Sequence, residues 1–373
     1  MRRALIVTTV SGFLPQFEMS NVEILQNKGY EIHYASNFDY PFYGHDNSRL
    51  EGTGIICHQV DFQRSPYKMK NIIVFRQIEV LLEKFNFDLI HCHTPMAAVI
   101  TRLVAKRDKV GTVIYTAHGF HFFKGAPLLN WVLYYPLERL LARRTDMIIT
   151  INHEDYQAAQ KFKCRFVEYV PGVGVDIEIK IKKPLDRKYM GFENKILLLS
   201  VGELSKRKNH EVIIRALGRL KNPDLVYLIC GQGASLDYLK KLAVENGVEN
   251  QVLFWGYIED IYAVYAITDI FLLPSLQEGL SRALLEAMAA GLPIIASSIR
   301  GNNDLIVHQK NGLLVDIADV KAYAEAIDYL IHHPEVMDSM KEQNLKMIKK
   351  YDRKLINSKM RCLYDKAEDV SKI

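Results

Sequence analysis

The chain has 373 residues, too many for one ordinary domain and suited to two domains of roughly 150–200 residues each. Hydrophobic residues make up 49% and charged residues 24%, as expected of a soluble globular protein with a sizeable core. The formal net charge of +5 suits an anionic ligand or an anionic membrane surface, but it is too small to indicate nucleic-acid binding.

Signals for export and for disulfides are weak. The five cysteines are scattered and odd in number, without a C-x-x-C pair, which favours a reducing compartment over a disulfide framework. The short apolar run Ala4–Val10 is followed by polar residues, so it predicts a first strand and not a signal peptide. No stretch approaches ~18 uninterrupted apolar residues, which argues against a transmembrane helix. We therefore expect a cytoplasmic protein.

Short β-branched apolar runs alternate with longer amphipathic segments, a pattern typical of βαβ units and parallel sheets. The strands expected in the first half are Ala4–Val10, Glu31–Ser36, Ile55–Val60, Asp88–His93, Val113–His118, Asp146–Ile151 and Phe166–Val170. The helices expected between them are Ser20–Lys28, Asn71–Phe85, Met96–Lys106, Leu128–Arg143 and Glu154–Lys163.

A stretch with glycine, proline and lysine, from Val170 to about Asn194, is the best candidate for a linker. The alternation then restarts, and from Asp319 onward the chain is predicted to be helical. The strands expected in the second half are Lys195–Val201, Leu225–Cys230, Gln251–Trp255, Ile270–Pro274, Pro293–Ala296 and Gly312–Val315. The helices expected there are Asn209–Leu220, Leu236–Asn246 and Ser281–Ala290. The pattern predicts an α/β fold with two facing Rossmann-like domains, and ligands in the crevice at the carboxyl ends of the strands.

The strongest motif begins where the strand 270–274 ends, with the sequence P-S-L-Q-E-G-L-S. Ser281 suits the N-cap of a helix whose first amides would bind an anion such as a diphosphate. Glu278 in the loop and Glu286 in the helix could each accept hydrogen bonds from the hydroxyls of a sugar. The alternative is a helix with ordinary surface glutamates, although an unpaired charge at Glu286 would be costly among its apolar neighbours.

The segment 274–293 resembles the E-x7-E signature of retaining family 4 glycosyltransferases, which have the GT-B fold. The flanking P-S and E-A-M-A-A-G-L-P sequences match the usual pattern of that family as well. The resemblance implies that Glu278 contacts the donor sugar and that Glu286 holds the ribose of the nucleotide. It also implies that the amides of Gly279, Leu280 and Ser281 lie near the phosphates.

A second motif, V-G-E-L-S-K-R-K-N-H at 201–210, directly follows a strand. Three adjacent cations oppose the positive end of a helix dipole, and a bound diphosphate would relieve this; the alternative is a solvated loop. The motif is similar to the family's G-R-L-x-x-x-K-[GN] loop, whose arginine and lysine neutralise the leaving diphosphate. Lys208 falls on the lysine, but Glu203 stands at the arginine position. We expect Arg207 or Lys206 to supply the second charge, unless this branch of the family uses fewer.

Two weaker motifs also follow strands of the second half. Gly231 and Gly233 form a G-x-G turn that lets the backbone approach a phosphate closely, although many strand-to-helix turns look the same. The segment 251–260 resembles the family's F-x-G-x-x-x-D element, which makes the backbone of Tyr257 and Ile258 a candidate for recognition of the base.

Histidines and a glycine stand out in the first half. A lone histidine such as His118 is more often structural, yet it matches the T-x-H-G element of the family, whose histidine faces the donor sugar. Gly12 matches more loosely a glycine loop near the donor phosphates. His91 and His93 recur along one strand like a metal pair, but two ligands make no closed site, and we expect structural roles for both.

Aromatic and basic residues gather between 121 and 144. Phenylalanine, tryptophan and tyrosine lead into Arg139, Arg143 and Arg144, a combination that suits an anionic membrane surface. The alternative is that the apolar side chains of this segment belong to the core.

The resemblance covers nearly the whole chain and implies three parts. They are an acceptor-side domain at 1–172, a nucleotide-sugar-binding domain at 173–350, and a helix at 351–373 that crosses back to the N-terminal domain. It implies transfer with retention from a nucleotide diphosphate sugar, preferably a UDP-sugar, to a hydroxyl, with His118, Lys208 and Glu278 as catalytic residues. The nucleotide sugar is the only co-substrate expected. We expect no metal requirement, because no D-x-D dyad stands in a suitable loop.

The neighbourhood 119–122 resembles bacterial enzymes of capsule and exopolysaccharide assembly. The expected acceptor is therefore a polyprenyl-diphosphate-linked glycan at the inner face of the cell membrane. A sugar-nucleotide epimerase of the GT-B fold would need no acceptor and stays open as the alternative, although the E-x7-E element and the lysine loop favour a transferase. A nicotinamide dehydrogenase would need G-x-G-x-x-G after the first strand, which residues 8–13 lack. The intact glutamate pair argues against a non-catalytic binding protein.

Overall fold

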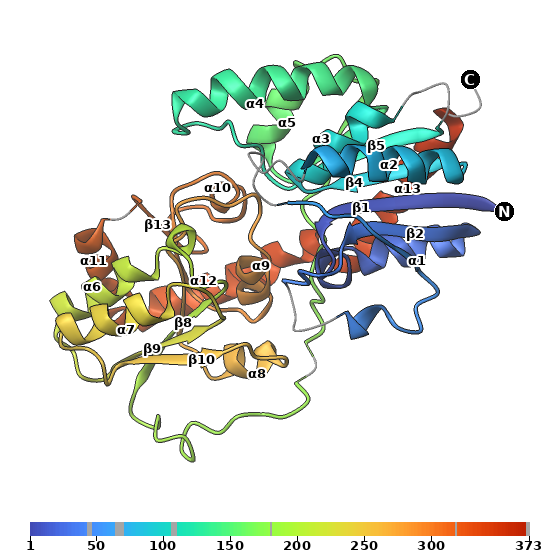
Figure 1. Ribbon diagram of the computed structural model, residues 1–373. Helices are drawn as coiled ribbons and strands as arrows, with labels where there is room; N and C mark the ends of the chain where they lie inside the picture. The colour runs from blue at the N-terminus through green and yellow to red at the C-terminus, as the bar shows by residue number, and fades with distance from the viewer. Residues whose placement is uncertain (43–46, 64–70, 106–109, 180, 318, 371–373) are drawn as a thin grey trace. The chain divides into compact units, whose positions relative to one another are not determined.

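The computed structural model describes residues 1–42, 47–63, 71–105, 110–179, 181–317 and 319–370. The chain divides into two compact units: unit 1 comprises Met1–Val173 and Lys354–Ile373, and unit 2 comprises Gly174–Arg353. Each unit contains one parallel β-sheet with helices on both faces (Figure 1). The predicted α/β fold with two Rossmann-like sheets is confirmed.

Unit 1 contains a seven-stranded sheet in the order β3-β2-β1-β4-β5-β6-β7, with every adjacent pair parallel. Its strands are β1 Arg2–Val10, β2 Tyr30–Asn37, β3 Ile56–Gln59, β4 Leu89–His93, β5 Thr112–Ala117, β6 Met147–Thr150 and β7 Phe166–Tyr169. Its helices and helical turns are η1 Leu14–Glu18, α1 Met19–Asn27, η2 Ser48–Leu50, α2 Asn71–Lys84, α3 Pro95–Val104, α4 Leu128–Leu141, η3 Ala142–Arg144, α5 His153–Ala159 and α13 Arg353–Val370.

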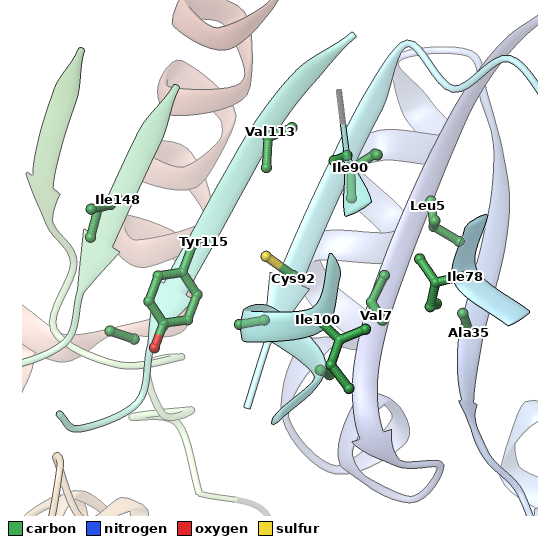
Figure 2. Close-up of a cluster of buried hydrophobic side chains, with 14 of the residues drawn as sticks. Leu5, Val7, Ala35, Ile78, Ile90, Cys92, Ile100, Val113, Tyr115 and Ile148 are labelled. Carbon is green, nitrogen blue, oxygen red and sulfur yellow. The ribbon is translucent and has the colours of Figure 1, made fainter. Parts of the chain in front are cut away.

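Alternate residues of the central strands pack against helices on opposite faces of the sheet. Leu5 and Val7 of β1 contact the cluster formed with α2, α3 and α5, where Ile78 and Ile100 also lie (Figure 2). Ala4 and Ile6 enter the other cluster, with α1 and the C-terminal α13. Because both faces are covered, the central strands contain continuous apolar runs, such as Ala4–Val7 of β1, which explains why they were visible in the sequence.

Unit 2 contains a six-stranded parallel sheet in the order β10-β9-β8-β11-β12-β13. Its strands are β8 Ile196–Val201, β9 Leu225–Cys230, β10 Val252–Gly256, β11 Ile270–Leu273, β12 Ile294–Ser297 and β13 Leu313–Val315. Its helices and helical turns are η4 Lys206–Lys208, α6 His210–Leu220, α7 Leu236–Glu245, α8 Ile261–Ala266, α9 Arg282–Ala289, α10 Asn302–Leu305, α11 Val320–His332, α12 Pro334–Met347 and η5 Ile348–Tyr351. Every expected strand of both halves is present, with ends shifted by two residues at most.

Five short helical elements were not predicted: η1, η2, η4, α8 and α10. Each has six residues or fewer, which is too short for a helical period to register in the sequence. Among the residues that the structure describes, no helix has both the length and the apolar character that crossing a bilayer requires.

A buried ion pair joins two helices of unit 1. Arg102 of α3 donates from both terminal nitrogens to the carboxylate of Glu138 on α4, at 2.9 and 3.0 Å. Its guanidinium carbon also lies 3.9 Å from the ring centroid of Tyr115. Arg102 is fully buried and Glu138 nearly so, hence neither charge can be compensated by water if its partner is lost.

We expect Glu138→Ala to lower the free energy of unfolding of unit 1 by about 3–5 kcal/mol, because it leaves a buried guanidinium unpaired. Guanidinium-chloride unfolding followed by circular dichroism measures the change. Glu79→Ala, which breaks the exposed Arg76–Glu79 pair, is the control and should cost less than about 1 kcal/mol. Equal effects of the two substitutions would contradict the importance of the buried pair.

Candidate active site

Lys208 and Glu278 form a buried ion pair in unit 2. Lys208 Nζ lies 2.7 Å from Glu278 Oε1, and each residue is only 8% exposed. Lys208 ends the turn η4 after β8, and Glu278 lies in the loop after β11. Because β8 and β11 are neighbours in the sheet, their carboxyl ends bring together two motifs that are 70 residues apart in the sequence.

Backbone contacts fix the two loops to each other. Leu276 N donates to the carbonyl of Arg207 at 2.8 Å, and Asn209 Nδ2 donates to the carbonyl of Pro274 at 3.1 Å. Asn209 has a positive φ of 53°, a left-handed conformation that glycine and asparagine tolerate best. This conformation gives a physical reason for the K-[GN] pattern: the residue after the lysine must turn left-handed.

Arg207 is the second cation at Glu278. Its Nη1 atom lies 3.3 Å from Glu278 Oε1 and also donates to the carbonyl of Gln277 at 3.0 Å. Burial alone would raise the pKa of Glu278, but Lys208 and Arg207 outweigh it, and the pKa is lowered overall. Glu278 is therefore an ionised carboxylate, and the cations whose charge seemed to require a diphosphate have a partner within the protein.

Glycines make room for the lysine loop. A Cβ on Gly202 would lie 2.9 Å from Lys208 Cε, and a Cβ on Gly231 would lie 1.8 Å from the carbonyl oxygen of Gly202. A Cβ on Gly233 would lie 2.3 Å from the carbonyl oxygen of Leu204. The G-x-G turn after β9 is thus required by close packing against the loop after β8, a reason that does not depend on a phosphate.

Glu286 is buried on α9 and has a partner that the sequence analysis overlooked. Arg282, four residues earlier, donates from Nε to Glu286 Oε1 at 2.8 Å, and the hydroxyl of Tyr265 lies 3.4 Å from Oε2. Burial raises the pKa of Glu286, while Arg282 opposes that change. The helix start is as predicted: the Ser281 hydroxyl accepts a hydrogen bond from Leu284 N and so caps α9.

Other predicted residues of unit 2 follow neighbouring strands. Tyr257 comes directly after β10 and is 55% exposed, whereas Ile258 packs against the apolar core. Gly279 lies close to the loop after β12, since a Cβ on Gly301 would be 2.2 Å from its carbonyl oxygen. Arg300, which we did not predict, donates from Nε to the carbonyl of Glu278 at 3.3 Å. The predicted residues of unit 2, together with Arg300, therefore follow five adjacent strands, in the sheet order β10-β9-β8-β11-β12, and lie at the edge formed by the carboxyl ends of those strands.

His118 lies in unit 1, where β5 ends. The ring of Phe13, which follows Gly12, packs edge-on against it with ring centroids 5.0 Å apart. His118 Nε2 is 3.1 Å from Nδ1 of His93, and Glu18 Oε1 is 3.6 Å from His118 Nε2. The structure therefore brings Phe13, the neighbour of Gly12, against His118 and adds Glu18 and His93 to this cluster.

Burial controls the protonation of this cluster. It lowers the pKa of His118 to about 4 and the pKa of His93 well below its ordinary value, so both imidazoles are neutral at pH 7. It raises the pKa of Glu18 to about 8, although a hydrogen bond from Asn21 opposes the change.

His91 and His93 differ in their surroundings. Both ring nitrogens of His91 are occupied, at 2.8 Å from the hydroxyls of Tyr364 and Thr116, which is the structural role that we expected. His93 instead contacts His118 and Glu18, at 3.1 and 3.5 Å from its Nδ1 atom. No sequence signal points to this contact, because its partners come from β5 and from the unpredicted turn η1.

Comparison with known proteins identifies the family. The model "Glycosyl transferases group 1" matches residues 182–347, and the model "Glycosyl transferase 4-like" matches residues 4–152. "Putative glycosyltransferase EpsD" of Bacillus subtilis (strain 168) is 32% identical over an alignment of 381 positions, which covers 99% of this chain and 98% of that protein. The chain belongs to the group 1 glycosyltransferases. The resemblance inferred from the E-x7-E motif is thereby confirmed.

Two further relatives extend the comparison. An Escherichia coli UDP-Gal:alpha-D-GlcNAc-diphosphoundecaprenol alpha-1,3-galactosyltransferase is 28% identical over 337 residues, 86% of this chain and 85% of that protein. The crystal structure of Anabaena Alr3699/HepE in complex with UDP matches with a TM-score of 0.77 and covers 100% of both chains at 19% identity. At that identity the structural match supports the fold alone, and the fold is the predicted GT-B type.

Proposed function

We propose that this glycosyltransferase moves a sugar, with retention of configuration, from a UDP-sugar to a hydroxyl of a polyprenyl-diphosphate-linked glycan. The observation that carries the proposal is the buried Lys208–Glu278 pair with Arg207 beside it, at the edge of the sheet where the family motifs meet. The donor and acceptor classes are supported by the relatives, since the Escherichia coli enzyme is named for both. Membership of a transferase family argues against the epimerase alternative.

In this proposal, Lys208 and Arg207 neutralise the diphosphate, assisted by the amides of Gly279, Leu280 and Ser281 at the start of α9. Cations held in place before the reaction stabilise the charge that develops on the departing diphosphate without reorganisation. Lys208 can serve Glu278 and a phosphate at once, because an ammonium group has three donors. Arg207 is the better candidate than Lys206 for the second charge, since its side chain already reaches Glu278.

The remaining roles follow the family motifs. Glu278 contacts the donor sugar, Glu286 holds the ribose, and the backbone after Gly256 at Tyr257 and Ile258 contacts the base. Gly231 and Gly233 shape the loop after β9 next to the phosphates. In unit 1, Gly12 adjoins the phosphates and His118 faces the donor sugar.

Substitutions at the ion pair test the site. We expect Lys208→Ala to lower turnover by about 10²–10³-fold, because it removes charge where the diphosphate becomes more negative. Glu278→Gln should lower turnover while keeping most of the UDP affinity, and Glu286→Gln should weaken UDP binding by about 1–3 kcal/mol. Steady-state kinetics with a panel of UDP-, GDP- and ADP-sugars, calorimetry with UDP and NAD, and thermal melts provide the measurements.

Two controls separate chemistry from folding. Lys206→Ala alters the exposed lysine of the same turn and should keep full turnover. The double variant Lys208→Ala/Glu278→Gln leaves no buried carboxylate unpaired, so it should melt closer to the natural protein than Lys208→Ala does while staying inactive. Full activity in Lys208→Ala and Glu278→Gln, or binding of NAD without UDP, would place the active site elsewhere.

We propose further that transfer needs no divalent cation, because Lys208 and Arg207 supply the positive charge that a metal supplies in other transferases. Activity should therefore survive an excess of EDTA, measured as turnover of the preferred UDP-sugar before and after chelation. Loss of activity that magnesium or manganese restores would contradict this assignment.

The membrane contact predicted from composition would lie on α4. One side of this helix exposes an apolar stripe at spacings of three and four residues, formed by Leu128, Leu129, Val132, Leu133, Pro136 and Leu140. Exposed cations lie before and after the stripe, at Lys124, Arg139, Arg143 and Arg144. Apolar side chains bordered by basic residues suit the headgroup region of an anionic bilayer, where a lipid-linked acceptor is found. We propose on this basis that the protein works in the cytoplasm, at the inner face of the membrane.

We expect the protein to sediment with vesicles that contain phosphatidylglycerol and to bind less as salt is raised. Leu129→Asp/Leu133→Asp should reduce this binding at least about tenfold, since burial of two leucines contributes several kcal/mol. Leu355→Asp, at an exposed leucine of α13 on the opposite face of the sheet, is the matched control. Equal sedimentation of all three proteins would exclude α4 as the contact.

A further inference from the structure

We propose that Glu18, His93 and His118 form a binding site for a divalent ion of the zinc class. Each side chain has one ligating atom close to those of the other two: Glu18 Oε1, His93 Nδ1 and His118 Nε2. They form the only such trio of histidine, cysteine or acidic residues in the described part of the chain.

The distances suit a central ion. The three atoms are 3.1, 3.5 and 3.6 Å apart. Zinc bonds to nitrogen and oxygen of about 2.0–2.1 Å in a tetrahedral site set neighbouring ligands about 3.3–3.4 Å apart. The distances from Glu18 Oε1 to the two histidine nitrogens, 3.5 and 3.6 Å, are too long for good hydrogen bonds. A shared ion therefore explains the arrangement of the three atoms better than direct hydrogen bonding does.

The chemistry of the three groups also fits. Two imidazoles and one carboxylate form a ligand set that is common at zinc sites in proteins. Glu18 is 1% exposed, and its second oxygen accepts a hydrogen bond from Asn21, which orients the carboxylate. Among the described residues, the ion-pair contacts of Glu18 Oε1 are with His93 and His118 and not with a lysine or arginine.

The proposed metal site has room for a fourth ligand. A cavity of about 20 Å³ borders Glu18 and His118, together with Asn21 and Thr116, and a single water molecule fits this volume. Glu18 reaches the cluster because it ends the π-helical turn η1, an irregular element that is frequent at functional sites.

A second group of neighbouring residues, Glu31, His33 and His58, shows that proximity alone does not make a metal site. His33 Nδ1 lies 2.8 Å from His58 Nε2, but Glu31 Oε1 lies 3.0 Å from the other ring nitrogen of His33. The three groups form a chain across the imidazole and do not converge on a centre. His58 therefore provides a matched control for histidine removal.

The experiment is a zinc titration of the full chain, free of any histidine tag and treated with chelator beforehand, by calorimetry and by the visible spectrum of bound cobalt(II). We expect one equivalent to bind in the natural protein and in His58→Gln. In Glu18→Gln and His118→Asn the affinity should fall at least about tenfold, because each removes one of three ligands. His118 is partly exposed, so His118→Asn should fold even if the buried Glu18→Gln does not, and thermal melts identify folded variants.

Absence of saturable zinc binding to the natural protein, or undiminished affinity in a folded His118→Asn, would overturn the site. One consequence rests on the proposed function: an ion that engages His118 should slow transfer, and chelation should restore the rate. Zinc that binds without slowing turnover would refute this consequence. The titration needs no donor or acceptor, so it tests the metal site even if the proposed transfer fails.

Discussion

The ion pair between Lys208 and Glu278 joins the loops that follow two adjacent strands, and the surrounding contacts of unit 2 maintain that junction. Gly202 leaves space for the lysine side chain, Asn209 turns the chain left-handed after it, and Gly231 allows the next loop to pack closely. A parallel sheet makes this arrangement possible, since only there do the carboxyl ends of β8 and β11 meet at one edge. The sequence motifs are separated by 70 residues, and the sheet makes them one site.

The pair also imposes a condition on ligand binding. A diphosphate that approaches Lys208 and Arg207 competes with an ionised carboxylate that already contacts both. If the diphosphate binds where we propose, the cations are fixed in position before the donor arrives, and donor binding exchanges part of one interaction for another. Such an exchange costs little reorganisation, because the positive charges stay where they are and only the balance of their partners changes.

Much of this organisation was predictable from residue patterns, and the failures have local causes. Strands were located within two residues because burial on both faces makes them continuously apolar, whereas η1, α8 and α10 are too short to show a period. The partner of Glu286 could have been found, since Arg282 stands four residues earlier on the same helix. The contacts of Arg300, and those of His93 with Glu18, depend on how strands and turns meet, which no spacing in the sequence encodes. Gly231 and Gly233 were singled out for a phosphate, whereas the structure shows that a Cβ at either position would clash with neighbouring backbone.

The pKa shifts of buried polar groups differ between the two units. This difference bears on whether transfer needs a metal in unit 2 and on whether unit 1 binds one. In unit 2 the buried carboxylate of Glu278 keeps its charge, because two cationic side chains lower its pKa. In unit 1 the buried groups are driven toward neutrality: the pKa of Glu18 is raised to about 8 and that of His118 is lowered to about 4. A metal at the diphosphate would duplicate charges that Lys208 and Arg207 already provide. The proposed metal between Glu18, His93 and His118 would occupy a separate site, so a transferase without a catalytic metal is consistent with a metal site in its other unit.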